Sequence, residues 1–399
     1  MKPNSRKILI GNHRLLKNLN SNAILNLVRT NAPISGANLA KITGMRPSTI
    51  QNILKNLEKE GLVLKIGSGN STKLGGRKPT LWKICGDYGY VVGIQLELNE
   101  IQAVLVDLNS QMIGEKKIKI SRFNELADID NKVIRIIDDL LASKNIQKHQ
   151  LLGIGIGVSG LVDISDGVIL KTSLLPQSQQ PIQLERSLKR HFDIPIYVEN
   201  DANAAALAEK WFGKAKGYDH IVFTLAMVDR DVFGIGFGLI FGNEIYRGAN
   251  MFAGETNPFT LTIKEILKTY SDFDGDVLTI GGQNVPIDEL EIHDLLKALD
   301  YQNETAIRFF KETGKIIGKE LLNVVNLLDP SMIIIGGEIA KAKQFILKPI
   351  EETLHNGYTL GVERKFHLVD SSLPDHSVAL GTATIILQNI FQEPLTSSI

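Results

Sequence analysis

Residues 198–209 read Val-Glu-Asn-Asp-Ala-Asn-Ala-Ala-Ala-Leu-Ala-Glu. A strand-like segment ends here in an amide and a carboxylate, and an alanine-rich helix begins directly after them. This arrangement predicts that Asn200 and Asp201 project into a cleft beside the helix N-terminus, where α/β folds place ligands. The alternative is a helix N-cap, a role that Asp fills well. Taken alone, the segment favours the cap.

The sequence around this segment alternates between strands and helices. Period-two and β-branched patterns predict strands over residues 90–98, 102–108, 151–157, 196–198 and 221–225. Such alternation is typical of an α/β domain. The glycines of residues 153–157 are a weak signal, because a buried strand that contains glycines has the same pattern.

Length and composition describe a soluble globular protein of two or three domains. The chain has 399 residues, of which 43% are hydrophobic and 22% charged. A single cysteine, Cys85, excludes an internal disulfide framework and a thiolate-rich metal cage. The longest apolar runs, such as residues 332–335, are strand-sized, and no signal-peptide core follows the basic start. We therefore expect a cytoplasmic protein without a membrane partner.

The neutral net charge conceals a strong asymmetry. Residues 1–83 hold 15 Lys and Arg against two acids, Glu58 and Glu60, which is a net charge of +13. The remaining residues hold 29 basic and 42 acidic side chains, a net charge of −13. This division predicts an N-terminal module that meets a polyanion and a larger module that does not. The alternative is a solvated basic face.

The basic segment has the pattern of three short helices. Helical spacing predicts the first over residues 21–30, and Ser35 precedes a second that ends at Thr43-Gly44. Pro47 opens the third helix. Its apolar stripe consists of Ile50, Ile53, Leu54 and Leu57. The short turn before the last helix is typical of a helix-turn-helix.

A β-wing is predicted after the third helix. Gly61 ends that helix, and residues 62–66 predict a strand that precedes a Gly/Ser/Asn-rich tip and a return strand. Three helices followed by a wing make a winged helix-turn-helix, which binds double-stranded DNA. We assign residues 1–83 to this domain, including its wing and linker, and residues 84–399 to the second.

The third helix carries short polar side chains opposite its apolar stripe. Gln and Asn can donate to and accept from adenine, while Ser and Thr reach phosphate oxygens. The predicted DNA contacts on this helix are Pro47, Ser48, Thr49, Gln51, Asn52 and Lys55. In the Gly-Gly-Arg-Lys-Pro segment of residues 75–79, Arg77 and Lys78 are further candidates, with Arg77 entering the minor groove. A flexible linker explains that segment equally well.

Three further stretches accompany residues 198–209 in a fixed order. They are Gly-Val-Ser-Gly-Leu-Val-Asp at residues 157–163, residues 246–255, and Asp-Pro-Ser-Met-Ile-Ile-Ile-Gly-Gly within residues 326–338. From residue 20 onward the chain resembles the ROK family of repressors, open reading frames and sugar kinases, in particular the N-acetylglucosamine and xylose repressor branch. The Glu-Asn-Asp-Ala-Asn and Asp-Pro-x-x-Ile-Ile-Ile-Gly-Gly segments carry this resemblance.

The resemblance implies an actin-like/hexokinase-like fold with a sugar between two lobes. We place these lobes at roughly residues 84–200 and 201–380, with a C-terminal helix that returns to the first lobe. The sugar-binding residues implied by matching position are Ser159, Gly160, Asn200, Asp201 and Glu255. In the kinases, the residue that matches Asp201 is the general base.

The sequence departs from the kinases at both phosphate loops. Their Asp-x-Gly-Gly-Thr turn corresponds here to residues 93–99, Gly-Ile-Gln-Leu-Glu-Leu-Asn, in which a carboxylate replaces the glycines. A unit negative charge about 4 Å from a phosphate costs about 4 kcal/mol at an effective dielectric of about 20. The second loop, a Gly-Thr-Gly run in the family, is replaced by residues 227–233, which add two acids. We therefore expect no catalytic residues, no enzyme activity and no cofactor.

The family's structural zinc site is also missing from the sequence. Pro258 stands where the family has a zinc-binding His, and no cysteine follows. Ligand count therefore excludes that site. Residues 259–299 match no pattern that we can interpret.

Three functions remain open after this comparison. The first is a repressor of carbohydrate-utilisation genes whose degenerate kinase cleft binds a sugar or a sugar derivative. The second is a sugar kinase with a DNA-binding appendage, and the third is a ligand-free regulator controlled by a protein partner. A single head reads one half-site, so we expect a homodimer or homotetramer on a two-fold operator.

Overall fold

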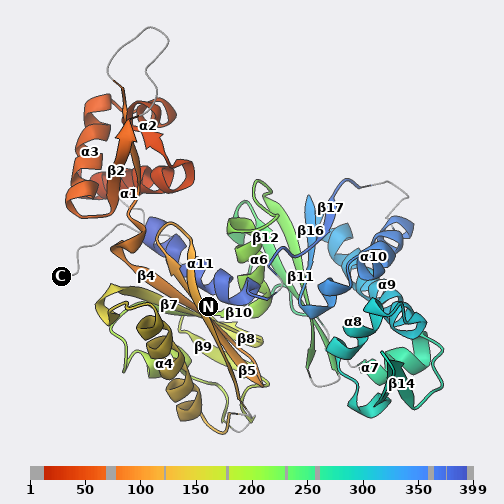
Figure 1. Ribbon diagram of the computed structural model, residues 1–399. Coiled ribbons are helices and arrows are strands. Elements are labelled where there is room, and N and C mark those ends of the chain that lie inside the picture. Colours follow the sequence, from red (N-terminus) through yellow and green to blue (C-terminus); the bar gives the residue numbers. More distant parts are fainter. Residues whose placement is uncertain are drawn as a thin grey trace.

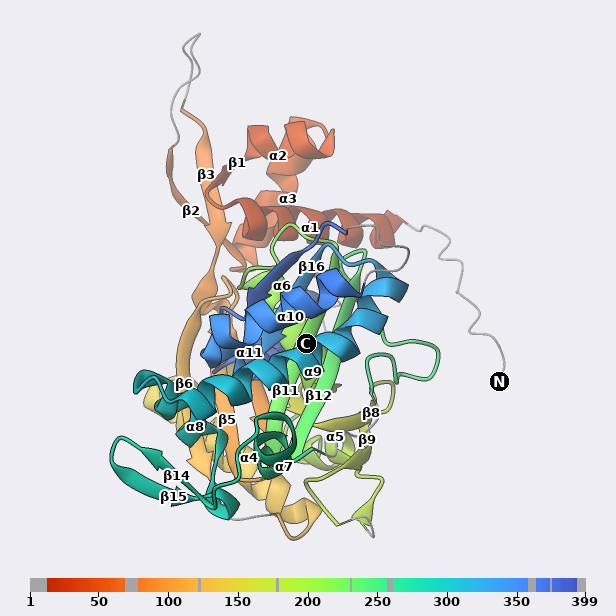
Figure 2. The same cartoon turned by 90° about the vertical axis from the view of Figure 1, so that its right-hand side faces the viewer.

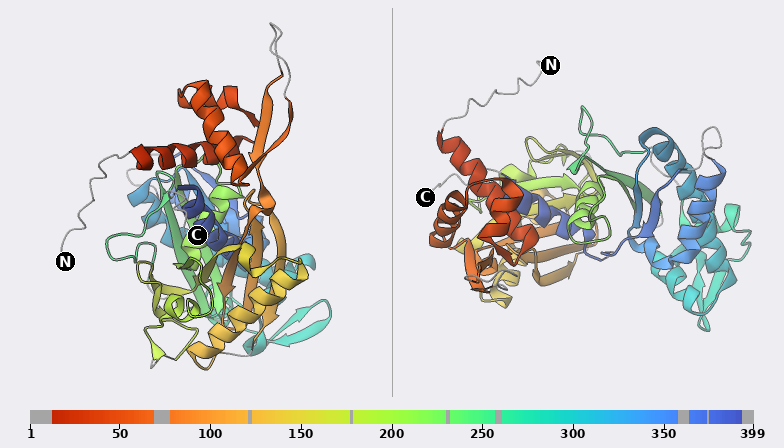
Figure 3. Two further views of the ribbon diagram at one scale, coloured as in Figure 1. Left: turned by 90° about the vertical axis from the view of Figure 1, so that its left-hand side faces the viewer. Right: turned by 90° about the horizontal axis from the view of Figure 1, so that it is seen from above.

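The computed structural model describes residues 13–68, 78–120, 123–176, 179–229, 232–256, 261–357, 364–373 and 375–392. A small N-terminal head stands above the first of two lobes, each of which is built on its own sheet (Figure 1). Seen from above, the head covers the first lobe and leaves the second free (Figure 3).

The head is the predicted winged helix-turn-helix. Its helices are α1 (His13–Asn31), α2 (Gly36–Thr43) and α3 (Pro47–Lys59), and its sheet has the order β1 (Ile34–Ser35), β3 (Thr80–Ile84), β2 (Val63–Ser68). The Ser35 hydroxyl caps α2 by accepting a hydrogen bond of 3.2 Å from the Asn38 backbone N–H, and Gly44 ends α2 at φ +71°. The start and end signals in the sequence were therefore correct, although α1 is longer than predicted.

Both lobes repeat one strand order. The first sheet runs β10 (Ile196–Asn200), β7 (Leu151–Val158), β4 (Tyr90–Leu96), β5 (Glu100–Asp107), β6 (Met112–Lys119). The second runs β17 (His367–Asp370), β16 (Met332–Gly336), β11 (His220–Asp229), β12 (Val232–Phe241), β13 (Glu244–Ile245). In each, three antiparallel strands are joined by two parallel strands beside the first. This duplication confirms the predicted two-lobed α/β fold.

Two helices fill the space between the sheets, as Figure 1 shows. They are α6 (Asp201–Trp211) and α11 (Ser377–Gln392). Residues 201–209 of α6 are all buried, because alanines let the helix approach its neighbours closely. At Gly381 of α11 an added Cβ would lie 1.7 Å from the Ala204 carbonyl oxygen. The alanine run thus has a packing role besides starting the helix.

The remaining elements cover the outer faces of the sheets. In Figure 2, α9 (Glu304–Leu328) and α10 (Gln344–Asn356) lie in front of the second sheet, while α4 (Leu126–Ser143) packs on the first lobe. The other helices and strands are η1 (Gly86–Tyr88), η2 (Lys148–Gln150), β8 (Gly160–Asp163), β9 (Val168–Thr172), α5 (Leu184–Leu188), α7 (Ile263–Glu265), η4 (Ile266–Tyr270), β14 (Val277–Ile280), β15 (Gln283–Pro286), η5 (Ile287–Glu289), α8 (Ile292–Asp300) and η6 (Glu338–Ala342).

Much of the uninterpreted stretch of sequence, residues 259–299, is now accounted for. From residue 261 onward its elements α7 to α8 contribute Ile263, Ile266, Leu278 and Leu295 to the core of the second lobe. None of the helices in the described residues is long and apolar enough to cross a membrane.

Candidate functional site

The outer face of α3 displays the residues that the sequence predicted for DNA. Its apolar stripe, Ile50, Ile53, Leu54 and Leu57, is buried in the head. Every predicted DNA contact on the opposite face is exposed: Pro47, Ser48, Thr49, Gln51, Asn52 and Lys55. A salt bridge of 2.8 Å between Lys65 and Glu58 ties the wing strand β2 to α3. The head therefore presents one polar, basic surface of helix and wing.

Two exposed cations of the head were missed by sequence reasoning. Arg46 occupies the N-cap position of α3 without capping it by its side chain, and Lys41 lies in the last turn of α2. Arg46 could have been found from the +13 charge of the segment and its place just before Pro47, because cations near a helix start reach phosphates. Lys78 is exposed, while Arg77 lies outside the described residues.

The five predicted sugar-binding residues converge where the two lobes meet. We call Ser159, Gly160, Asn200, Asp201 and Glu255 the junction site. The Asn200 amide donates to the Gly160 carbonyl oxygen at 3.1 Å and to Glu255 Oε1 at 3.4 Å. Its Oδ1 accepts from the Asn203 backbone N–H at 3.2 Å, so Asn200 also caps α6. The N-cap alternative is thus correct for Asn200, and its role in a sugar-binding cleft stays a prediction.

Asp201 is the first residue of α6 and is 6% exposed. Its Oδ1 accepts a hydrogen bond of 2.8 Å from the Ala202 backbone N–H. The pKa of the Asp201 carboxyl is raised to about 7, chiefly by burial and in addition by the charges of Glu255 and Glu97, while hydrogen bonds from Ala202 and Ser159 oppose the rise. The group can therefore carry or release a proton near neutral pH.

A buried ion pair, which the sequence did not predict, lies next to the junction site and holds its residues in place. Glu199 is 3% exposed and binds Arg247, with Nη2–Oε2 at 2.5 Å and Nε–Oε2 at 3.1 Å. The other Glu199 oxygen accepts from the Asn203 amide at 3.2 Å and from the Asn200 N–H at 3.0 Å. This network fixes the loop after β13 against the end of β10, 48 residues away in sequence.

Glu255 reaches the junction site on a loop held against β12. The Gly254 carbonyl accepts from the Phe237 N–H at 3.0 Å, and Thr256 Oγ1 donates to the Ile235 carbonyl at 2.9 Å. Gly254 has φ +92°, and an added Cβ would lie 1.9 Å from the Phe237 carbonyl oxygen. Only glycine fits this position. Desolvation raises the pKa of the Glu255 carboxyl.

A tight turn between β4 and β5 lies within the residues that the sequence analysis matched to the first phosphate loop. The Glu97 N–H donates to the Glu100 carbonyl at 2.9 Å, and Gln95 donates to the Glu97 carboxylate. The pKa of Glu97 is raised to about 7, chiefly by desolvation from the surrounding protein and in addition by the charges of Glu100 and Glu338. Because the Glu97 side chain remains exposed to solvent, water screens part of this effect. The sequence did not predict that the charge of Glu338 acts on Glu97.

Two other predictions from the sequence fall outside the described residues. Arg230 and Asp231 of the second altered loop, and Pro258 of the absent zinc motif, lie outside the described residues. The flanking strands β11 and β12 pair up to Asp229 and Val232, which leaves two residues to connect them. Within the described ranges no three His, Cys, Asp or Glu side chains are grouped to hold a metal ion.

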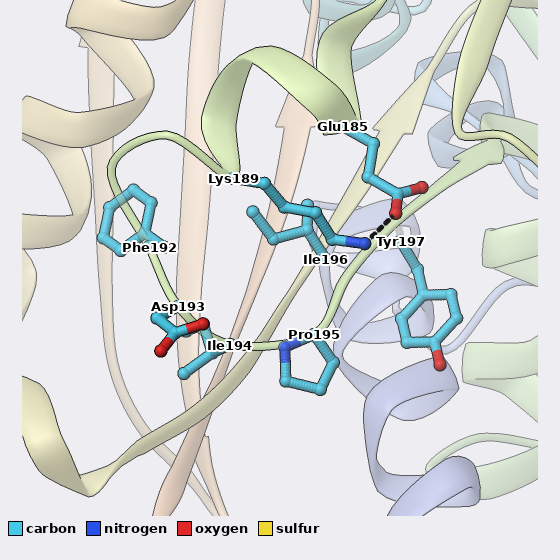
Figure 4. Close-up of a pocket in the computed structure, with 8 residues that line it drawn as sticks. All are labelled: Glu185, Lys189, Phe192, Asp193, Ile194, Pro195, Ile196 and Tyr197. Carbon is cyan, nitrogen blue, oxygen red and sulfur yellow. Dashed lines mark hydrogen bonds and ion pairs between the residues drawn. The ribbon is translucent and has the colours of Figure 1, made fainter.

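A separate pocket lies at the other end of β10 (Figure 4). It is lined by Glu185, Lys189, Phe192, Asp193, Ile194, Pro195, Ile196 and Tyr197. Glu185 and Lys189 pair with each other, and the rings of Phe192 and Tyr197 point to opposite sides of the pocket. The polar groups of this pocket do not point toward one common position that a ligand could occupy. The junction site is therefore the candidate effector site.

Comparison with known families gives two matches along the chain. The sequence profile of the ROK family matches residues 91–262 and 266–389. A profile described as winged helix-turn-helix DNA-binding matches residues 18–63.

Curated relatives are similar over nearly their full length. The xylose repressor of Bacillus subtilis (strain 168) is 26% identical over 398 residues, which cover 95% of this chain and 98% of the relative. The DNA-binding transcriptional dual regulator NagC of Escherichia coli (strain K12) is 25% identical over 394 residues, which cover 94% of each chain.

Solved structures share the fold. A ROK family transcriptional regulator, a homolog of the E. coli MLC protein, superposes with a TM-score of 0.76 at 20% identity and covers 94% of this chain and 97% of that one. A ROK family glucokinase from Streptomyces griseus, in complex with glucose and AMPPNP, gives a TM-score of 0.61 at 20% identity and covers 74% of this chain and 99% of that one. The predicted head and two-lobed fold are confirmed.

Proposed function

This chain belongs to the ROK family and carries a winged helix-turn-helix ahead of its ROK domain, and from that premise we propose that it is a sugar-responsive, DNA-binding transcriptional repressor. The observation that carries the proposal is that one chain combines two features. The outer face of α3 is exposed, polar and basic, and the loops beside the junction site carry carboxylates. The names of the xylose and N-acetylglucosamine repressors support the same role.

The proposed effector is an uncharged sugar. Carboxylates gather around the junction: the charges of Glu255 and Glu97 act on Asp201, and that of Glu338 acts on Glu97. Arg247, the cation of the adjoining loop, is already bound to Glu199. A sugar phosphate would therefore meet repulsion without a free cation from this loop to offset it. A pentose or an N-acetylated hexose avoids that repulsion and can use the Asn200 amide and the Asp201 and Glu255 oxygens.

Lack of kinase activity is part of the proposal. Phosphoryl transfer depends on positioned donors around the phosphates rather than on covalent help from the protein. The β4–β5 turn offers Glu97 in place of a glycine-rich cradle, with Glu338 nearby. Nucleotide triphosphate is therefore repelled at the position where the kinases hold it.

Calorimetry with the full chain tests the effector class directly. We expect heats of binding from D-xylose or N-acetyl-D-glucosamine and none from glucose 6-phosphate or ATP. Asp201→Ala should remove the thermal shift that the bound sugar produces without changing DNA affinity in its absence. Absence of binding by either neutral sugar would contradict the proposal.

A sugar kinase with a DNA-binding appendage is the second candidate, and one observation favours it. A pKa of about 7 at Asp201 is what a general base at neutral pH requires. Coupled-enzyme detection of ADP release with the same sugars separates the two functions. ATP-dependent turnover that Asp201→Asn abolishes would establish the kinase.

Paired heads are the proposed form on DNA. A single α3 reads one half-site, and a two-fold operator needs two heads one or more helical turns apart. A dimer or tetramer in light scattering, together with a pseudo-palindromic sequence selected from random duplexes, is the expected result.

A further inference from the structure

Arg29 connects the head to both helices that lie between the lobes. It lies in the last turn of α1, and its guanidinium carbon is 4.0 Å from the centre of the Trp211 ring and 5.2 Å from that of Phe391. Trp211 is the last residue of α6, and Phe391 lies in the last turn of α11. One cation from the DNA-binding head thus touches the ends of two helices of the ROK domain.

The surroundings of Arg29 are unusual for an arginine. Its Nε and Nη2 donate to Asn26 Oδ1 at 3.2 and 3.0 Å, and within the described residues no carboxylate pairs with it. Desolvation alone lowers the pKa of Arg29 to about 10. A desolvated cation without a counter-ion depends on the faces of aromatic rings, so its energy changes steeply when those rings move.

The helix under Arg29 also forms part of the junction site. Asn200 caps the N-terminus of α6, Asp201 is its first residue, and Trp211 ends it. Eleven residues at about 1.5 Å rise separate these ends by roughly 15 Å. Because residues 201–209 are buried, the helix is held along its length and cannot bend freely. A ligand that displaces its first turn therefore displaces Trp211.

The apolar packing across this joint is continuous. One cluster of buried side chains combines Leu25 and Val28 of α1 with Ala208 of α6 and Leu387 of α11. The head and the ROK domain thus share a core at this joint, and a shift of α6 relative to α11 changes the surface on which α1 sits.

We propose that Arg29, held between Trp211 and Phe391, is the positioning residue that couples sugar binding at the junction site to the orientation of the DNA-binding head. This inference rests on the proposed function, because it assigns the route by which that function is regulated. It also identifies Trp211 as the residue through which α6 acts.

The test compares DNA affinity with and without sugar in full-length variants. The probe is a labelled duplex that the wild-type protein selects from a random library, titrated with and without saturating D-xylose or N-acetyl-D-glucosamine. Wild type should show a sugar-dependent change in DNA affinity of about 5- to 150-fold. Arg29→Met and Trp211→Leu should reduce this change to less than about twofold while the sugar affinity without DNA, from calorimetry, stays within about twofold of wild type.

A matched control is available in the first lobe. Lys132 lies over the Phe123 ring at 5.6 Å, so Lys132→Met removes a cation–π contact that does not reach the head. It should leave the sugar-dependent change intact. If Arg29→Met proves unstable in thermal unfolding, Arg29→Lys and Trp211→Phe keep charge and ring while loosening the contact, and should weaken the coupling partially.

The outcomes separate the two claims. Sugar binding with wild-type coupling in both Arg29→Met and Trp211→Leu overturns the role of Arg29 and leaves the proposed function in place. Failure of wild type to bind either sugar contradicts the proposed function, and the coupling proposal falls with it.

Discussion

At the scale of single residues, the junction site keeps a carboxyl group where its charge is unfavourable. Asp201 is nearly fully buried, and its pKa is raised from the ordinary value of 3.8 to about 7. Between these values the folded protein binds more protons than the unfolded chain, so stability is lost as the pH rises through this window.

Asp201→Asn should therefore stabilise the protein more at high pH. We predict an increase in the free energy of unfolding of at most about 4 kcal/mol near pH 8, which shrinks near pH 5, as measured by urea unfolding. Asp139→Asn is the control with opposite sign, since Lys116 lowers the pKa of that exposed carboxyl. Equal effects of Asp201→Asn at both pH values would argue against a raised pKa.

The Glu199–Arg247 pair makes a second prediction at this scale. Arg247→Met leaves a carboxylate that is 3% exposed without its cation, and should lower the free energy of unfolding by about 3–5 kcal/mol. Adding Glu199→Gln should recover part of the loss. Lys189→Met, which breaks a surface pair with Glu185, should cost less than about 1 kcal/mol in the same chemical denaturation series. A comparable loss in both variants would show that burial is unimportant here.

Sequence reasoning succeeded at this scale where neighbours in sequence are neighbours in space. Ser35 and Pro47 mark helix starts by their own chemistry, and Asn200 and Asp201 mark the start of α6 beside an alanine run. No local sequence pattern identifies Arg29 as a contact between the head and the ROK domain. Its partner Trp211 is far away along the chain, and no local pattern relates two side chains that only the packing of three helices brings together.

At the scale of elements, α3 offers residues with different expected roles. Gln51→Ala or Asn52→Ala should reduce discrimination at individual base pairs by about 1–3 kcal/mol. Lys55→Ala should weaken binding about equally on every sequence and lower the salt dependence. Competition binding with mutated duplexes distinguishes the two patterns. A uniform loss for Gln51→Ala would show that this residue touches only the DNA backbone.

The loop that carries Glu255 depends on one glycine. Gly254→Ala places a methyl group against the Phe237 carbonyl, and should displace the loop and abolish the sugar-induced thermal shift. Gly242→Ala is the matched control, because Gly242 also has positive φ, +58°, but open space around its Cβ position, and should cost only about 1–2 kcal/mol. An unchanged shift in Gly254→Ala would remove Glu255 from the sugar site.

Strands and helices were predicted well where the hydrophobic periodicity of the sequence and the residues that end an element agree. The strands expected at residues 90–98 and 151–157 are β4 and β7, with ends moved by two residues or fewer. Residues 259–299 of the second lobe were not predicted, because η4 and the short hairpin β14–β15 are stabilised by contacts with α9 and the rest of that lobe rather than by a local period.

At the scale of the whole molecule, charge is divided between its parts. The first 83 residues have a net charge of +13 and the rest −13. We predict that log DNA affinity falls linearly with log salt, with a slope of about 0.9 for each phosphate contacted and several units in total. Anisotropy titrations across a range of salt concentrations measure this slope. An affinity independent of salt would be incompatible with the assigned DNA surface.

The joint at Arg29 also has a consequence for synthesis on the ribosome. The head is translated first, but Phe391 follows Arg29 by 362 residues. At about 5–20 residues per second, roughly 20–70 seconds separate the two. During that interval a completed head lacks its contact with α11, so under the coupling proposed through Arg29 each nascent chain carries a DNA-reading domain that no effector can yet control.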